Sequence, residues 1–84
     1  MTRIELRRQV ELAIQQDWYT FAESHPRLAA VLDQTLLVEE AVRALEDDPH
    51  YHTTMSQAIA QGATAQTLID LVSHFVNAWL RRLI

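Results

Sequence analysis

The stretch from residue 65 to residue 84 constrains the fold more than any other part of the chain. At 100° per residue, its large apolar side chains spread over more than half of a helix's circumference. They are Leu68, Ile69, Leu71, Val72, Phe75, Val76, Trp79, Leu80 and Leu83. A helix that packs on one neighbour needs an apolar stripe of only about 100°. The pattern therefore predicts a helix that is buried on two sides.

A first helix is predicted directly after Thr2. Thr2 and Glu5 have the spacing of a capping box, in which Thr2 accepts a hydrogen bond from a backbone N–H and Glu5 reaches back. The helix is expected to run for about 21 residues with one apolar side. That side carries Leu6, Val10, Ala13, Ile14, Trp18 and Phe21, with Asp17 on its shoulder reaching water. Leu12 and Tyr19 point the opposite way and are predicted to form a second, smaller contact surface.

Pro26 marks the start of a second helix, because proline disfavours helix at the preceding residue and suits the first helical turn. This helix is predicted as one continuous element over residues 26–47. Its apolar face carries Leu28, Val31, Leu32, Thr35, Val38, Val42 and Leu45, with Glu39 at one edge. At 1.5 Å per residue, Asp17 and Glu39 would lie about 12 Å and about 21 Å from the turn near residue 25. A paired-carboxylate site of the glycosidase or di-iron type is therefore not supported.

Asp48 and Pro49 are predicted to open a third, shorter helix, as its N-cap and its first helical residue. It is expected to span about 13 residues and to carry on one side Tyr51, Met55, Ala58 and Ile59. Gly62, the only glycine, is the predicted C-cap, and Thr64 is the predicted cap of the last helix. The predicted fold class is all-α: a compact bundle of four helices, three long and one short, joined by tight turns within a single domain of residues 1–84.

Size and composition bear on the compartment and on oligomerisation. The chain has 84 residues, 49% of them hydrophobic, which is near the lower size limit for a self-sufficient core and favours further burial by oligomerising. The absence of cysteine excludes disulfides and thiolate metal sites. No signal-peptide pattern follows Met1, and the longest apolar run, residues 28–32, is far short of the roughly 20 residues that span a bilayer. We therefore expect a soluble, cytoplasmic protein.

Charge is distributed unevenly along the chain. All seven basic residues are arginines, and five lie near the two ends: Arg3, Arg7, Arg8, Arg81 and Arg82. The acids concentrate in the middle, at Asp33, Glu39, Glu40, Glu46, Asp47 and Asp48. Ends and middle could attract each other between subunits, although a solvated surface is the commoner explanation. A net charge of −4 argues against general affinity for a phosphate backbone.

A helix-turn-helix regulator is the alternative functional hypothesis. Such motifs pack two helices around a tight turn and need suitable residues at fixed spacings. Within residues 50–75, this spacing is found at Ala58, Gly62, Leu68 and Leu71. A regulator of this kind would bind DNA as a dimer. Its recognition helix, however, would offer Gln66, Thr67 and Asp70, with no basic residue before Arg81. Because phosphate contacts normally come from basic residues around such a helix, nucleic-acid binding is the less supported function.

Neither a metal site nor a catalytic site is indicated. His50 and His52, two positions apart on a helix, point about 200° away from each other, and neither has a partner three or four positions on. His25 and His74 are isolated. There is no nucleophile–base pair and no glycine-rich phosphate loop, so we expect no enzymatic activity and no cofactor. The last helix lacks the many Lys or Arg residues that an interfacial membrane helix displays.

The hypothesis with most support is a small, non-catalytic, self-associating helical protein that acts as a protein–protein interaction or adaptor module. A monomeric four-helix bundle would leave one flank of the last helix in water, at a loss of about 1.5–3 kcal/mol for each large apolar side chain. We therefore predict a homodimer, or a higher even-numbered oligomer, which also binds another protein. Its interface is predicted to contain Leu68, Val72, Phe75, Val76, Trp79, Leu80 and Leu83.

Overall fold

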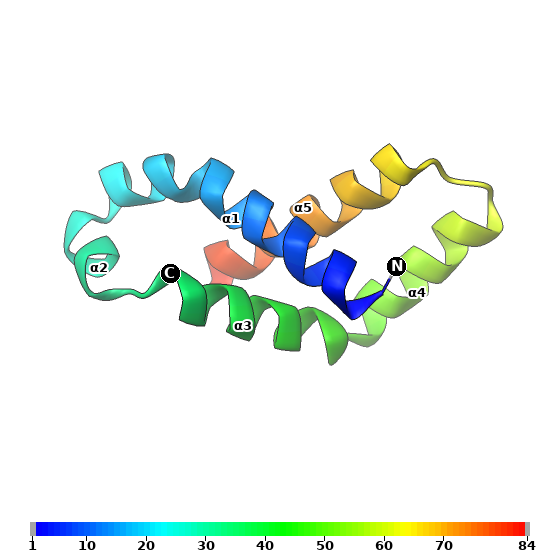
Figure 1. Cartoon of the computed structure of the whole chain (residues 1–84), viewed down its shortest axis with the longest axis horizontal. Helices are drawn as coiled ribbons and strands as arrows, with labels where there is room; N and C mark the ends of the chain where they lie inside the picture. Colours follow the sequence, from blue (N-terminus) through cyan, green and yellow to red (C-terminus); the bar gives the residue numbers. More distant parts are fainter. Residues whose placement is uncertain (1, 84) are drawn as a thin grey trace.

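The computed structural model describes residues 2–83, and within this range it contains five α-helices and no β-strand. The helices are α1 (Arg3–Ser24), α2 (Pro26–Val31), α3 (Gln34–Glu46), α4 (Pro49–Ala60) and α5 (Ala65–Leu83), as Figure 1 shows. They form a bundle that measures 43 × 21 × 21 Å. The predicted fold class, an all-α bundle, is confirmed.

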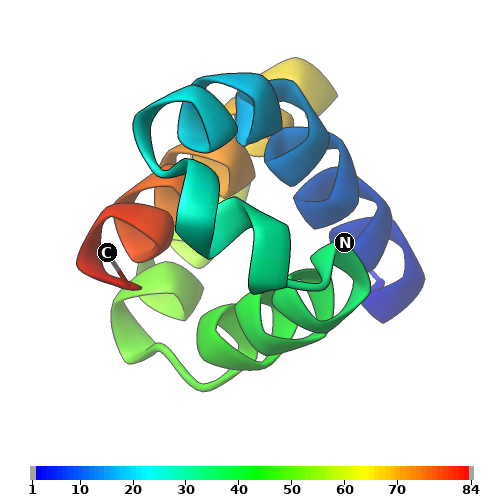
Figure 2. The ribbon, with the colours of Figure 1, turned by 90° about the vertical axis from the view of Figure 1, so that its left-hand side faces the viewer.

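The bundle is built around the crossing of α1 and α5 (Figure 1). α1 contacts α2, α3 and α5, while α4 contacts α3 and α5. Figure 2 looks along the long axis and shows α1, α3 and α5 around a common interior. The core contains Leu6, Val10, Ala13 and Ile14 of α1; Leu37, Val38, Ala41, Val42 and Leu45 of α3; Tyr51 and Met55 of α4; and Val72, Phe75, Val76 and Leu80 of α5. α2 contributes no buried residue.

Three helices start where the sequence predicts, at side-chain caps. Thr2, Asp48 and Thr64 each accept a hydrogen bond from a backbone N–H in the first turn of α1, α4 and α5, over 3.2, 2.9 and 3.2 Å. Pro49 is the first residue of α4, where a missing N–H leaves no intrahelical bond unmade. Because these caps satisfy backbone donors that have no partner within the helix, they fix the starts of all three helices.

The predicted continuous helix over residues 26–47 is wrong. It is divided into α2 and α3 at Leu32 and Asp33, which both have an extended backbone. Asp33 is the N-cap of α3, and its Oδ1 accepts a hydrogen bond from the N–H of Thr35 over 2.8 Å. A short acidic side chain competes for backbone N–H groups and so stabilises a helix start better than a helix interior. The chain changes direction there, and Val31 and Thr35, both predicted on the buried face, are exposed.

Gly62 closes the turn between α4 and α5, as predicted. It follows the C-cap Gln61 and has a φ of +79°, in the left-handed region. Its N–H donates to the carbonyl of Ile59 over 3.0 Å, and the N–H of Ala63 donates to the carbonyl of Ala58 over 3.0 Å. These two bonds form a Schellman motif, which satisfies carbonyl groups at the end of α4. The motif fixes the direction in which the chain enters α5.

Replacing Gly62 with valine is expected to lower the free energy of unfolding by about 1–2 kcal/mol, because a β-branched residue strongly disfavours the left-handed backbone. An added Cβ would meet no atom within 4 Å, so the loss would come from backbone conformation and not from a clash. Urea denaturation followed by circular dichroism measures the change. Gly62→Asn is the control and should lose less, since asparagine tolerates this conformation better. An unchanged unfolding free energy in Gly62→Val would show that α4 and α5 are joined differently.

Candidate functional site

Most of the interface predicted on α5 lies inside the core of a single chain. Four of the seven predicted contact residues are buried by the chain's own helices: Val72, Phe75, Val76 and Leu80. Leu68 and Trp79 are partly buried against the same core, and Leu83 is exposed. The four are buried because α1, α3 and α4 all contact α5, so they are not accessible surface. Contact of Leu68, Trp79 and Leu83 with a second chain stays a prediction.

Eight large apolar side chains of the range 2–83 are exposed, and of these only Leu83 belongs to the predicted interface. They are Ile4, Leu12, Tyr19, Leu28, Val31, Leu36, Ile59 and Leu83. The accessible surface is 5799 Å², against about 5,100 Å² expected for a compact monomer of 9.7 kDa from the usual scaling with mass. The chain therefore exposes more surface than is usual for its size. Where exposed apolar side chains gather into a patch, they mark sites of protein–protein interaction.

Two of these side chains lie on the side of α1 that faces away from the core, as predicted. Leu12 is 44% exposed and Tyr19 is 82% exposed. Arg8 and Glu23 share this side, because all four residues lie within about 60° of one another at 100° per residue. We call these four residues the outer face of α1. Both charged residues are exposed, and neither forms an ion pair with another residue of the range 2–83.

A groove between the amino-terminal halves of α1 and α5 borders the outer face. Its volume is about 360 Å³, and its apolar walls come from Leu12, Leu68 and Ile69. Glu5 and Arg8 line it as well. Because Leu12 and Arg8 belong both to the groove and to the outer face, the two form one continuous surface. This surface is the candidate interaction site.

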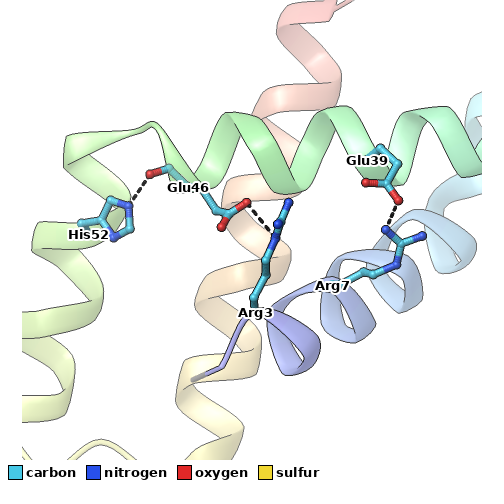
Figure 3. A network of polar contacts seen from close by, with 5 residues as sticks. All are labelled: Arg3, Arg7, Glu39, Glu46 and His52. Atoms are coloured by element: carbon cyan, nitrogen blue, oxygen red, sulfur yellow. Dashed lines mark hydrogen bonds and ion pairs between the residues drawn. The ribbon is translucent and has the colours of Figure 1, made fainter.

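Ion pairs join the first turns of α1 to α3. Arg3 Nε lies 3.3 Å from Glu46 Oε1, and Arg7 is paired with Glu39 (Figure 3). His52 Nε2 lies 2.5 Å from the carbonyl oxygen of Glu46 and so connects α4 to the end of α3. In these two ion pairs, the basic amino-terminal end of the chain attracts the acidic middle of the same chain. Exposed pairs of this kind contribute about 0.2–1 kcal/mol each, so they orient α1 on α3 more than they stabilise the fold.

A second cleft, of about 280 Å³, lies between the carboxyl-terminal halves of α1 and α5. We call it the polar cleft, because six of its eight lining residues are polar. Its walls are formed by Asp17, Thr20, Phe21, Ser24, His25, Asn77, Leu80 and Arg81. Asn77 Oδ1 is buried and has no hydrogen-bond partner among the described residues. Asp17 is half-buried at the shoulder of the apolar side of α1, as predicted. Sequence reasoning does not find this cleft, since the only signal is an acid within the apolar arc of α1.

Residues 2–83 contain neither a metal-binding cluster nor a membrane-spanning helix. No three His, Cys, Asp or Glu side chains in this range are placed to hold a metal ion. His50 packs against Phe75, with ring centroids 5.4 Å apart, whereas His52 contacts the carbonyl of Glu46. The two neighbouring imidazoles thus have separate contacts. No helix in the range is both long and apolar enough to cross a bilayer.

The two helices of the predicted helix-turn-helix are α4 and α5, joined by residues 61–64. Gln66, Thr67 and Asp70 are exposed near the start of α5, where a recognition helix would present them. Gln66 Nε2 donates a hydrogen bond to Asp70 Oδ1 over 3.0 Å, so two of these side chains bind each other. The start of α5 therefore presents a carboxylate, and no basic residue, to a DNA backbone.

Comparison of the chain with models of protein families, with curated proteins and with solved structures gives no match. The candidate interaction site and the polar cleft are therefore interpreted from their own geometry and chemistry.

Tyr51, where α4 packs on the core, has a perturbed acid–base equilibrium. Its ring is buried and lies edge-on to that of Phe75, with centroids 5.4 Å apart. Burial, and secondarily the carboxylate of Glu46, raises the pKa of the Tyr51 phenol above its ordinary value of 10.0. The folded protein therefore holds this proton more tightly than the unfolded chain. Tyr51 contributes stability that is fully present below about pH 10 and is lost as the pH rises through the folded pKa.

We expect the free energy of unfolding to fall as the pH is raised above about 10, and we expect Tyr51→Phe to lack this part of the fall. Chemical denaturation at a series of pH values measures it. Glu46→Gln should reduce the effect only in part, because it removes the smaller of the two causes. The same pH dependence in Tyr51→Phe as in the native protein would refute the assignment to Tyr51.

Proposed function

We propose that this protein is a small, non-catalytic interaction module of the cytoplasm that forms a homodimer and binds another protein. The observation that carries the proposal is the outer face of α1, where two apolar side chains are exposed beside two charges that form no ion pair within residues 2–83. A two-fold dimer brings the same face of both copies together, so it needs a face that is complementary to itself.

The outer face of α1 meets this requirement. Arg8 and Glu23 are equally far from the midpoint of residues 8–23, and so are Leu12 and Tyr19. If two copies of α1 pack antiparallel about a two-fold axis at that midpoint, Leu12 of each copy meets Tyr19 of the other. Arg8 of each copy then meets Glu23 of the other. The apolar contact and the ion pair therefore each form twice.

The energetics favour a weak but specific dimer. Covering Tyr19, which is 82% exposed in the single chain, is worth at most about 1.5–3 kcal/mol per copy. The Arg8–Glu23 pairs add little affinity but fix the orientation, because a parallel arrangement would place like charges together. One helix face buries less than the roughly 1,600 Å² of a standard interface, so we expect a dissociation constant in the micromolar range.

Exposed apolar residues outside α1 support the adaptor part of the proposal. Val31, Leu36, Ile59 and Leu83 lie on the other helices, and none belongs to the outer face of α1. Dimerisation through α1 does not require them. Self-association and the binding of a different protein can therefore use separate surfaces.

DNA binding by a dimer through α4 and α5 remains the alternative function. The exposed side chains of Gln66 and Thr67 and the tight turn before α5 support it, whereas the carboxylate of Asp70 and the net charge of −4 oppose it. Fluorescence polarisation with a duplex of random sequence at low salt separates the two functions. The interaction module is expected to show no binding, and salt-sensitive binding would favour the regulator.

Charge reversal on the outer face tests the dimer. Arg8→Glu and Glu23→Arg are each expected to raise the dimer dissociation constant about 5- to 30-fold, because each places like charges at both symmetric contacts. The double variant Arg8→Glu/Glu23→Arg restores opposite charges and is expected to return the constant to near its native value. Sedimentation equilibrium measures all three.

Arg82→Glu is the matched control, since Arg82 is exposed and lies outside the outer face. It should leave the dissociation constant unchanged. Tyr19→Ser should weaken the dimer without loss of helical signal, because Tyr19 is 82% exposed in the single chain and adds little to its packing. A mass that stays at 9.7 kDa up to high concentration, or a double variant as weak as the single ones, would contradict the proposal.

A further inference from the structure

The polar cleft contains oxygen acceptors that the protein itself leaves unused. Asn77 Oδ1 is buried and accepts no hydrogen bond from the residues of the range 2–83. The carboxylate of Asp17 lines the same cleft, is half-buried and pairs with no cation in the range 2–83. The hydroxyls of Thr20 and Ser24 lie beside it. Acceptors gathered in one cleft suit a ligand with several N–H donors, and an ammonium group has three.

A positive charge lines the cleft from the other helix. Arg81 of α5 forms no ion pair with Asp17, although both residues line the same cleft, and it pairs with no other residue of the range 2–83. An acid and an arginine that share a cleft without pairing leave room between them for a ligand that carries both charges. The guanidinium group is suited to a carboxylate, which it binds through two parallel N–H bonds.

Size and apolar walls restrict this ligand further. The cleft has a volume of about 280 Å³, just below the roughly 300 Å³ at which pockets for drug-sized ligands begin. Phe21 and Leu80 give it an apolar part, which suits a short hydrocarbon chain. We propose that the polar cleft binds a free amino acid with an aliphatic side chain, its ammonium group on Asp17 and its carboxylate on Arg81, with Asn77 in the wall beside it.

Three probes of matched shape test this proposal by NMR titration of the ¹⁵N-labelled full chain. They are L-leucine, 3-methylbutylamine, which lacks the carboxylate of leucine, and 4-methylpentanoate, which lacks its ammonium group. Leucine is expected to cause saturable shifts of the side-chain amide of Asn77. The amine should bind at least about threefold more weakly, and the acid should not saturate.

Variants separate the two charged contacts. Asp17→Asn, which keeps the shape of the side chain, should weaken leucine binding about tenfold. Arg81→Gln should weaken the binding of leucine but not that of the amine, a difference that a general folding defect would not produce. Asp70→Asn, on an exposed part of α5 outside the cleft, is the control and should bind as the native chain does. The absence of saturable shifts at Asn77 with leucine, or native affinity in both cleft variants, would overturn the proposal.

Discussion

The burial of Val10 and Ile14 of α1 against α3 and α5 is the packing on which the rest of the structure depends. Val10 is 0% and Ile14 is 1% exposed, and the other fully enclosed large side chains are Val42 of α3 and Val72 and Val76 of α5. Because branched side chains have few rotamers and interdigitate closely, this layer fixes how α1 crosses α5. The chain has only enough helix to cover one side of α1. The opposite side stays in water unless another molecule covers it.

Local chemistry explains which parts of the fold the sequence predicts. The caps at Asp48 and Thr64 and the turn at Gly62 depend on residues within about one helical turn, so their spacing reveals them. The break at Asp33 is different, because the apolar spacing of residues 28–45 continues through it and an acid is tolerated on the exposed side of a helix. The packing of α3 on α1 and α5, which the spacing does not reveal, is needed besides the capping preference of Asp33 to show that a new helix starts there.

The candidate sites also differ in how far the sequence predicts them. Leu12 and Tyr19 could be assigned to an exposed face from the helical period alone. The apolar arc of α5 shows how much of that helix is buried but not which molecule buries it, and at Val76 the chain's own core does so. The polar cleft joins Asp17 to Asn77, 60 positions further along the chain. The cleft depends on how α1 crosses α5, and the spacing of residues within either helix does not predict that crossing.

The outer face and the polar cleft use opposite sides of α1. Asp17 and Tyr19 are two positions apart, so their side chains point about 200° away from each other. A ligand in the cleft could influence the dimer only by shifting α1 between arrangements of different affinity, and the packing at Val10 and Ile14 resists such a shift. The element that can respond is α2, which contacts α1 alone and buries no residue. His25, directly before α2, lines the cleft, so a ligand there would lie next to this helix, whereas the outer face is on the far side of α1.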